Sequence, residues 1–156
     1  MKKAIALLLA LVMVFALCAC GGDKGTADNG EKVVKIGVFE PASGDSGAGG
    51  KKEMLGMQYA NQETPTVEIG GETYKVELVY SDNGSDSAKA VSAASKLVNE
   101  KVSLVLGSYG SGVSIAAGPT FGNAGLPAIG VTCTNPMVTA GNDYIFRICF
   151  LDPFQG

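Results

Sequence analysis

Short apolar runs alternate with segments of helical periodicity between Val33 and Ile148, and this alternation constrains the fold more than any other feature. The runs expected to form strands lie at residues 33–39, 74–80, 102–106, 127–131 and 144–148. Helices are expected at residues 51–61, at about 86–98 after a cap at Ser85 or Asp86, and at 111–123. Strands that alternate with helices form right-handed βαβ units. We therefore predict an α/β fold with a doubly wound parallel sheet.

The loops that follow the strands hold most of the polar residues that could contact a ligand. In a doubly wound sheet, ligands bind outside the carboxyl ends of the strands, at the point where the strand order reverses. The loops at that edge are residues 40–50, 81–86, 108–112 and 132–136. We expect the functional site among them.

Two of these loops offer groups of complementary charge. Ser111 and Gly112 open a helix, where exposed N–H groups and the helix dipole stabilise an anion such as a carboxylate. The Ser111 hydroxyl either donates to that carboxylate or caps its own helix. In the next loop, the Thr132 carbonyl can accept from an ammonium and the Thr134 hydroxyl can serve either charged end, unless the loop is only a turn closed by Pro136. Together these loops suit a zwitterion such as an amino acid.

Catalytic and nucleotide-binding patterns are missing from the sequence. It contains no histidine and no GxSxG motif, so zinc sites and serine hydrolase triads lose their usual groups. The stretch Gly44–Lys52 lacks the spacing of a P-loop, and Gly107–Gly112 reads GxxGxG where a dinucleotide site has GxGxxG. We expect no enzyme activity and no cofactor.

Other candidate sites have simpler interpretations. Asp82 and Asp86 do not match a calcium loop and are expected to shape a turn and cap a helix. Cys133 and Cys149 lie in apolar runs and are expected to be small buried residues, not a disulfide or a metal pair. The formal net charge of −3 and the lack of a basic cluster make nucleic acid an unlikely partner.

The N-terminus predicts export. Two lysines precede the apolar run 4–19, as in a signal peptide, and the run is shorter than the roughly 20 residues of a membrane span. The sequence Leu17-Cys18-Ala19-Cys20 resembles a lipobox, so we expect Cys20 to carry lipid; the alternative is an ordinary secreted protein cut near Ala19. Residues 21–32 are polar and glycine-rich, which predicts a flexible tether. The folded part is then expected outside the cell membrane or in the periplasm, anchored by Cys20.

A series of short motifs resembles one family in its order and spacing. The motifs are Lys35–Pro41, Ser43-Gly44, Gly125–Pro127, Thr134–Pro136, Tyr144–Arg147 and Asp152–Gly156. They resemble the leucine/isoleucine/valine-binding proteins of ABC importers, which are type I periplasmic binding proteins. The resemblance begins at Val33 and runs to the last residue. It implies that residues 33–156 form the N-terminal lobe of a two-lobed protein, stopping at the hinge with the second lobe missing.

The resemblance also assigns roles to single residues. It implies that Ser111 binds a ligand carboxylate, that Thr132 uses its backbone, and that Thr134 contacts the ammonium and the carboxylate. A bulky pocket residue of the family falls at Gly49, or at Ala48 if the loop is shifted by one, which implies extra room in the pocket. The cysteine pair of some relatives falls near Gly84 and Gly110, so that disulfide is absent.

The function that the resemblance implies is capture of an amino acid, branched-chain or otherwise small. The implied partner is the permease of an ABC importer. The alternative is a sensor domain of the same fold that reports an amide or an amino acid to a partner protein.

Overall fold

The structure is a computed structural model that describes residues 31–155. The chain divides into two units, Met1–Glu31 and Lys32–Gly156, and the fold below is that of the second unit. The predicted signal peptide, Cys20 and residues 21–30 of the predicted tether lie outside the described residues.

The described residues form one sheet with the strand order β2-β3-β1-β4-β5-β6. The strands are β1 (Val33–Glu40), β2 (Thr66–Ile69), β3 (Glu72–Asp82), β4 (Leu104–Leu106), β5 (Ala128–Gly130) and β6 (Ile145–Arg147). All neighbouring pairs are parallel except β2 and β3. Because β1 lies between β3 and β4, the strand order reverses at β1. This confirms the predicted doubly wound α/β fold and places its switch point at the end of β1.

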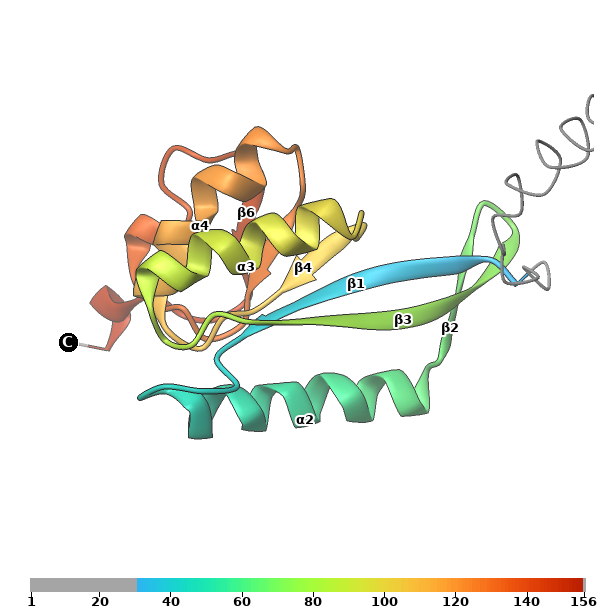
Figure 1. Cartoon of the computed structure of the whole chain (residues 1–156), viewed down its shortest axis with the longest axis horizontal. Coiled ribbons are helices and arrows are strands. Elements are labelled where there is room, and N and C mark those ends of the chain that lie inside the picture. The colour runs from blue at the N-terminus through green and yellow to red at the C-terminus, as the bar shows by residue number, and fades with distance from the viewer. Residues whose placement is uncertain (1–30, 156) are drawn as a thin grey trace, which may run out of the picture. The chain divides into compact units, whose positions relative to one another are not determined.

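Helices cover both faces of the sheet (Figure 1). Helix α2 (Gly47–Glu63) lies on one face, and α3 (Ser87–Asn99) and α4 (Ser111–Asn123) lie on the other. Two short 3-10 turns follow, η1 (Pro136–Val138) and η2 (Asp152–Phe154). Asp86 caps α3, since its carboxylate accepts from the N–H groups of Ala88 and Lys89 at 2.8 Å each. The predicted helix 111–123 is confirmed to the residue.

The hydrophobic core lies between the sheet and the pair α3 and α4. Phe39 of β1 and Phe121 of α4 pack edge to face with ring centroids 5.5 Å apart. Leu97 and Val105 are fully buried beside them. Aromatic side chains of this size contribute much of the buried apolar area of a core. This face of the sheet is therefore well packed.

The face toward α2 is open. Only Gly47 and Gly50 of α2 are buried, while Leu55 and Tyr59 are 63% and 65% exposed. A groove of about 690 Å³ runs between α2 and the sheet. It is lined mainly by aliphatic side chains of the strands, among them Val34, Ile36, Val76, Leu78, Leu104 and Leu106.

Within residues 31–155, no helix has the length and apolar character that crossing a membrane requires.

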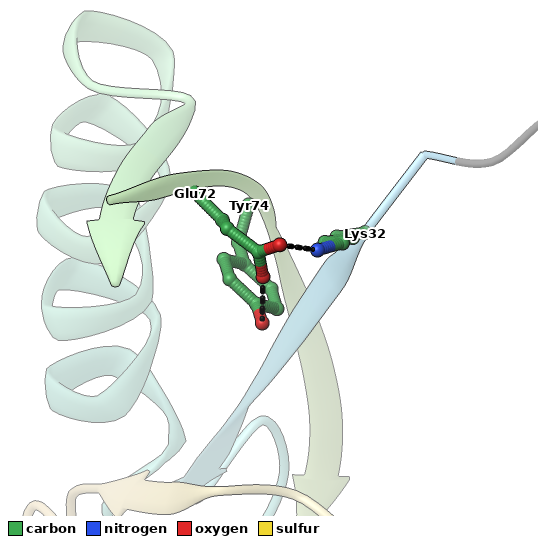
Figure 2. A network of polar contacts seen from close by, with 3 residues as sticks. All are labelled: Lys32, Glu72 and Tyr74. Atoms are coloured by element: carbon green, nitrogen blue, oxygen red, sulfur yellow. Dashed lines mark hydrogen bonds and ion pairs between the residues drawn. The ribbon is translucent and has the colours of Figure 1, made fainter. Parts of the chain in front are cut away.

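A polar contact fixes the start of the sheet (Figure 2). Lys32 precedes β1 and forms an ion pair with Glu72 of β3, which also accepts from the Tyr74 hydroxyl at 3.3 Å. The Lys32 ammonium lies 5.8 Å from the centroid of the Tyr74 ring. Lys32, which was predicted to end the tether, is thus part of the second unit.

The predicted strands differ from the observed ones by at most two residues at either end, and two elements differ more. Helix α2 begins at Gly47 and not at residue 51, because the N–H groups of Gly49 and Gly50 donate to the Ser46 carbonyl and build a first turn from glycine. Strand β2 was not predicted; its four residues are exposed, and it pairs with β3 across a turn at Gly70 and Gly71. Both turn glycines have positive φ, 62° and 81°, which other residues adopt with difficulty.

Both described cysteines are free thiols. Cys133 is fully buried, as predicted, and burial raises the pKa of its thiol. Its sulfur lies where a side chain at Gly130 would stand, so this strand end accepts only glycine without rearrangement. Cys149 is only half-buried, so the prediction of a buried residue is wrong there.

Candidate functional site

The loops at the carboxyl ends of β1 and β3 are held together by Asp82. Its Oδ1 atom accepts from the N–H groups of Ala42, Ser43 and Gly84 at 2.8, 3.2 and 2.9 Å. Its Oδ2 atom accepts from the Ser43 hydroxyl at 2.6 Å. Desolvation opposes ionisation, but these hydrogen bonds outweigh it and lower the pKa of Asp82. The predicted turn role of Asp82 is confirmed, and its anion fixes both loops.

A buried amide joins the β3 loop to the β4 loop. Asn83 is fully buried, and its Nδ2 atom donates to the hydroxyl of Ser108, also fully buried, at 2.9 Å. Its Oδ1 atom accepts from the Ser85 N–H at 3.1 Å. Buried polar groups of this kind stabilise a unique arrangement when they are hydrogen-bonded. The three loops around β1 are thus one connected structure.

Ser111 lies against the loop that follows β5. The N-cap of α4 is Gly110, and the first turn of α4 has no capping side chain and no acidic residue. The Ser111 hydroxyl oxygen accepts from the Asn135 N–H at 3.2 Å. Ser111 therefore does not cap its own helix, and the first N–H groups of α4 keep their capacity to bind an anion. Gly112 follows at the surface, with nothing within 4 Å of the position a Cβ would take.

Arg147 of β6 hydrogen-bonds the loop after β5. The guanidinium Nη1 atom donates to the carbonyls of Cys133 and Asn135 at 3.2 and 2.8 Å. Nη2 donates to the Pro136 carbonyl at 3.2 Å and to the Thr139 hydroxyl at 2.8 Å. One planar cation thus binds four acceptors and sets the shape of the loop that includes Thr132 and Thr134.

The two predicted threonines are placed differently. The Thr132 hydroxyl donates to Oε1 of Glu53 on α2, so this side chain is already engaged. Thr134 is half-buried, and its carbonyl accepts from the Asp152 N–H at 3.1 Å. The hydrogen bond from Asn135 to Ser111 brings this loop and the start of α4 together, as the switch-point prediction requires.

The room predicted beside Gly49 is filled. Gly49 lies in the first turn of α2, and a Cβ there would come within 2.6 Å of the Tyr109 ring. Tyr109 belongs to the loop between β4 and α4 and is 42% exposed. An aromatic ring from another loop therefore occupies the space that a bulky residue at position 49 would need. The structure therefore shows no extra room at Gly49 itself, while the alternative position, Ala48, is exposed.

A pair of carboxyl groups lies beneath these loops. Glu40, the last residue of β1, is 1% exposed, and the carboxyl group of Glu53 on α2 is its acidic neighbour. Burial first, and then the interaction with Glu53, raise the pKa of Glu40 to about 9. The N–H of Tyr109 donates to Oε2 of Glu40 at 2.7 Å and opposes this shift.

Sequence reasoning missed four of the residues that build this region: Arg147, Tyr109, Glu40 and Glu53. A cation inside the apolar run 144–148 and an acid at the end of the apolar run 33–39 were visible signals. A charge in such a run is expensive to bury unless it is hydrogen-bonded. Glu53 and Tyr109 gave no such signal, because their neighbours come from distant parts of the chain.

The family model described as "Periplasmic binding protein" matches residues 33–153. The chain belongs to this family. Its fold is that of one lobe of a type I periplasmic binding protein, and relatives named as leucine/isoleucine/valine-binding proteins place it on the branched-chain amino acid branch.

Three relatives illustrate the periplasmic binding protein match. A "Leu/Ile/Val-binding protein homolog 2" from Brucella abortus is 32% identical over 93% of this chain and 38% of its own length. A leucine-binding protein from Thermotoga maritima superposes with a TM-score of 0.73 at 39% identity, over 79% of this chain and 34% of its own. A branched-chain amino acid substrate-binding protein from Streptococcus pneumoniae, solved with isoleucine, gives 0.69 at 35% identity, over 78% and 35%. The chain therefore spans little more than a third of the length of these relatives.

Proposed function

We propose that this chain is the first lobe of an exported substrate-binding protein that captures an amino acid for an ABC importer. The observation that supports this most is the hydrogen bond between Ser111 and Asn135, which joins the start of α4 to the loop of Thr132 and Thr134. An uncapped helix start thereby lies beside a loop with carbonyl and hydroxyl groups. These are the two kinds of group that the ends of a zwitterion need.

Each end of the amino acid has a proposed contact. The carboxylate accepts from the Ser111 hydroxyl and from N–H groups at the start of α4, including that of Gly112. The ammonium donates to the Thr132 carbonyl and to the Thr134 hydroxyl. The side chain of the ligand lies toward Tyr109, whose ring covers Gly49. A small or branched aliphatic side chain fits beside an aromatic ring that already fills part of the pocket.

The test is calorimetry on a version of the protein that includes both lobes, with L-leucine, L-isoleucine, L-valine and the other common amino acids. We expect at least one of them to bind. Ser111→Ala should weaken that binding about 10- to 100-fold, because one charge-assisted hydrogen bond contributes about 1.5–3 kcal/mol. Ser92→Ala is the matched control, since Ser92 lies on the exposed side of α3 and bonds only the Lys89 carbonyl. Failure of every amino acid to bind would overturn the proposal.

Export and anchoring are part of the same proposal. Cys20 is proposed to be lipidated after signal cleavage, which holds the protein on the outer face of the membrane and near its permease. Two acyl chains anchor a protein stably where one does not. In a membrane fractionation, Cys20→Ser should move the protein into the soluble fraction. If the variant stays with the membrane, Cys20 is not the anchor.

A further inference from the structure

Glu40 is a buried acid that has no ion-pair partner within residues 31–155. Its side chain is 1% exposed, and it stands at the end of β1, beneath the loops of the proposed ligand site. Isolated carboxylates are very costly to bury, so a buried acid is neutralised or hydrogen-bonded. Within residues 31–155 no lysine or arginine forms an ion pair with Glu40 or with Glu53. The groups that face Glu40 are the Glu53 carboxyl from α2 and the Tyr109 N–H from the β4 loop.

The hydrogen bonds of the two carboxyl groups imply one proton between them. Oε2 of Glu40 accepts from the Tyr109 N–H, and Oε1 of Glu53 accepts from the Thr132 hydroxyl. The remaining buried oxygens, Oε1 of Glu40 and Oε2 of Glu53, have no hydrogen-bond partner among the described residues. Two ionised carboxylates are both acceptors and cannot bond each other, whereas an acid can donate to a carboxylate. A shared proton satisfies both remaining oxygens.

The pair connects four parts of the fold. Glu40 is the last residue of β1, and Glu53 belongs to α2. Their hydrogen-bond partners lie in two loops, Tyr109 before α4 and Thr132 after β5. Gly107 makes room for this arrangement, because a Cβ there would lie 2.7 Å from Oε1 of Glu40. Both loops joined through the pair face the proposed ligand site.

We propose that Glu40 and Glu53 are positioning residues, a carboxyl pair that shares one proton and sets the spacing of the two ligand-facing loops. The shared proton hydrogen-bonds Glu53 of α2 to Glu40 at the end of β1. Oε2 of Glu40 then accepts from the Tyr109 N–H, and Oε1 of Glu53 accepts from the Thr132 hydroxyl. Loss of the proton places two like charges side by side in a buried position, where they repel. The loops then separate, and the binding surface is lost. The effect on binding rests on the proposed function, but the effect on the loops does not.

The first test uses the full chain without ligand. Carbon-13 NMR follows the side-chain carboxyls of Glu40 and Glu53 from about pH 5 to about pH 10, while nitrogen-15 NMR follows the amides of Tyr109 and Thr132. We expect one carboxyl of the pair to stay protonated above neutral pH. Both amides should shift with the same midpoint. Independent titration of both carboxyls near their ordinary values, or amides that do not follow the carboxyls, overturns the proposal.

The second test uses the neutral isosteres Glu40→Gln and Glu53→Gln. A glutamine keeps the shape and the donor of the protonated acid, so we expect the fold to persist and the midpoint at Tyr109 and Thr132 to disappear. Glu77→Gln is the matched control, because Glu77 is an exposed acid on β3, and it should leave the midpoint unchanged. A midpoint that survives both pair variants overturns the proposal. If a variant fails to fold, the titration of the unmodified chain decides.

The third test measures how ligand affinity depends on the protonation of the pair. It uses a version of the protein with both lobes and the amino acid that binds it best. Affinity should fall about tenfold for each pH unit above the midpoint, and Glu40→Gln should remove this dependence. If no amino acid binds but the carboxyls and loops titrate together, the proposed function fails and the positioning role stands. If an amino acid binds with an affinity that does not follow the midpoint, the positioning role fails.

Discussion

At the scale of single residues, the loops of the proposed ligand site depend on a few charged side chains that hydrogen-bond their backbone. Arg147 is the clearest example, because its guanidinium bonds four acceptors in one loop. Asp82 does the same with N–H groups on the other side of β1. Neither side chain needs to touch a ligand to control the geometry of the site.

Arg147→Ala should lower the free energy of unfolding by about 2 kcal/mol, since it removes several charge-assisted hydrogen bonds to backbone carbonyls. Urea unfolding followed by circular dichroism measures this change. Lys96→Ala is the control; the Lys96 ammonium bonds one carbonyl, that of Tyr80, at an exposed position. The control should change stability by less than about 0.5 kcal/mol. Equal losses in the two variants would contradict the role assigned to Arg147.

At the scale of elements, α2 is the least ordinary part of the fold. It starts with a run of glycines, and its burial is confined to that end. A Cβ at Gly50 would collide with the Pro41 carbonyl and ring, whereas a Cβ at Gly56 would meet nothing within 4 Å. The same substitution at these two positions of one helix should therefore act in opposite directions.

Gly56→Ala should raise the free energy of unfolding by about 0.5–1 kcal/mol, the usual gain of alanine over glycine inside a helix. Gly50→Ala should lower it by about 1–3 kcal/mol, because α2 must move away from Pro41. Thermal unfolding of both variants against the unmodified chain measures the two changes. Stabilisation by both would show that α2 is not in contact with Pro41.

The elements also show what could be predicted from the sequence. Helix α3 and the alternation of strands with helices follow from periodicity, because they are set by local spacing and by a buried face. Strand β2 was missed because it is only four residues long and all four are exposed, although Thr66–Ile69 alternate between polar and apolar residues. The Glu40 and Glu53 pair could not be predicted, since it depends on how close α2 comes to the end of β1.

At the scale of the whole molecule, the buried acid makes stability depend on pH. The pKa of Glu40 is about 9 in the folded chain against an ordinary value of 4.5. Between these values the folded chain binds more protons than the unfolded chain, so the free energy of unfolding falls as pH rises. This contribution is complete below about pH 4.5 and is lost as pH passes about 9. The lowered pKa of Asp82 acts in a separate, acidic range, where stability falls as pH falls.

Melting temperatures measured across the neutral and alkaline range should therefore decline, and Glu40→Gln should flatten the decline. The Glu77→Gln control should keep it. A melting temperature that does not change between neutral pH and about pH 9 would contradict the raised pKa of Glu40.

The size of the chain limits how tightly it can bind. Three charge-assisted hydrogen bonds to a zwitterion provide about 5–9 kcal/mol, while immobilising a ligand costs about 4–15 kcal/mol. Micromolar affinity needs a net gain of about 8 kcal/mol. We expect the 156-residue chain to show no micromolar binding of L-leucine by calorimetry. Micromolar binding by this chain would mean that one lobe makes a complete site.

The groove beside α2 has a consequence for handling the protein. An apolar sheet face of this extent, with aliphatic side chains from the four neighbouring strands β2, β3, β1 and β4, is a surface on which chains adhere to one another. Self-association of the protein in solution should therefore be determined by this apolar face and not by the modest net charge of −3. Concentrated samples will scatter light, and fluorescent dyes that favour apolar surfaces will brighten on the native state.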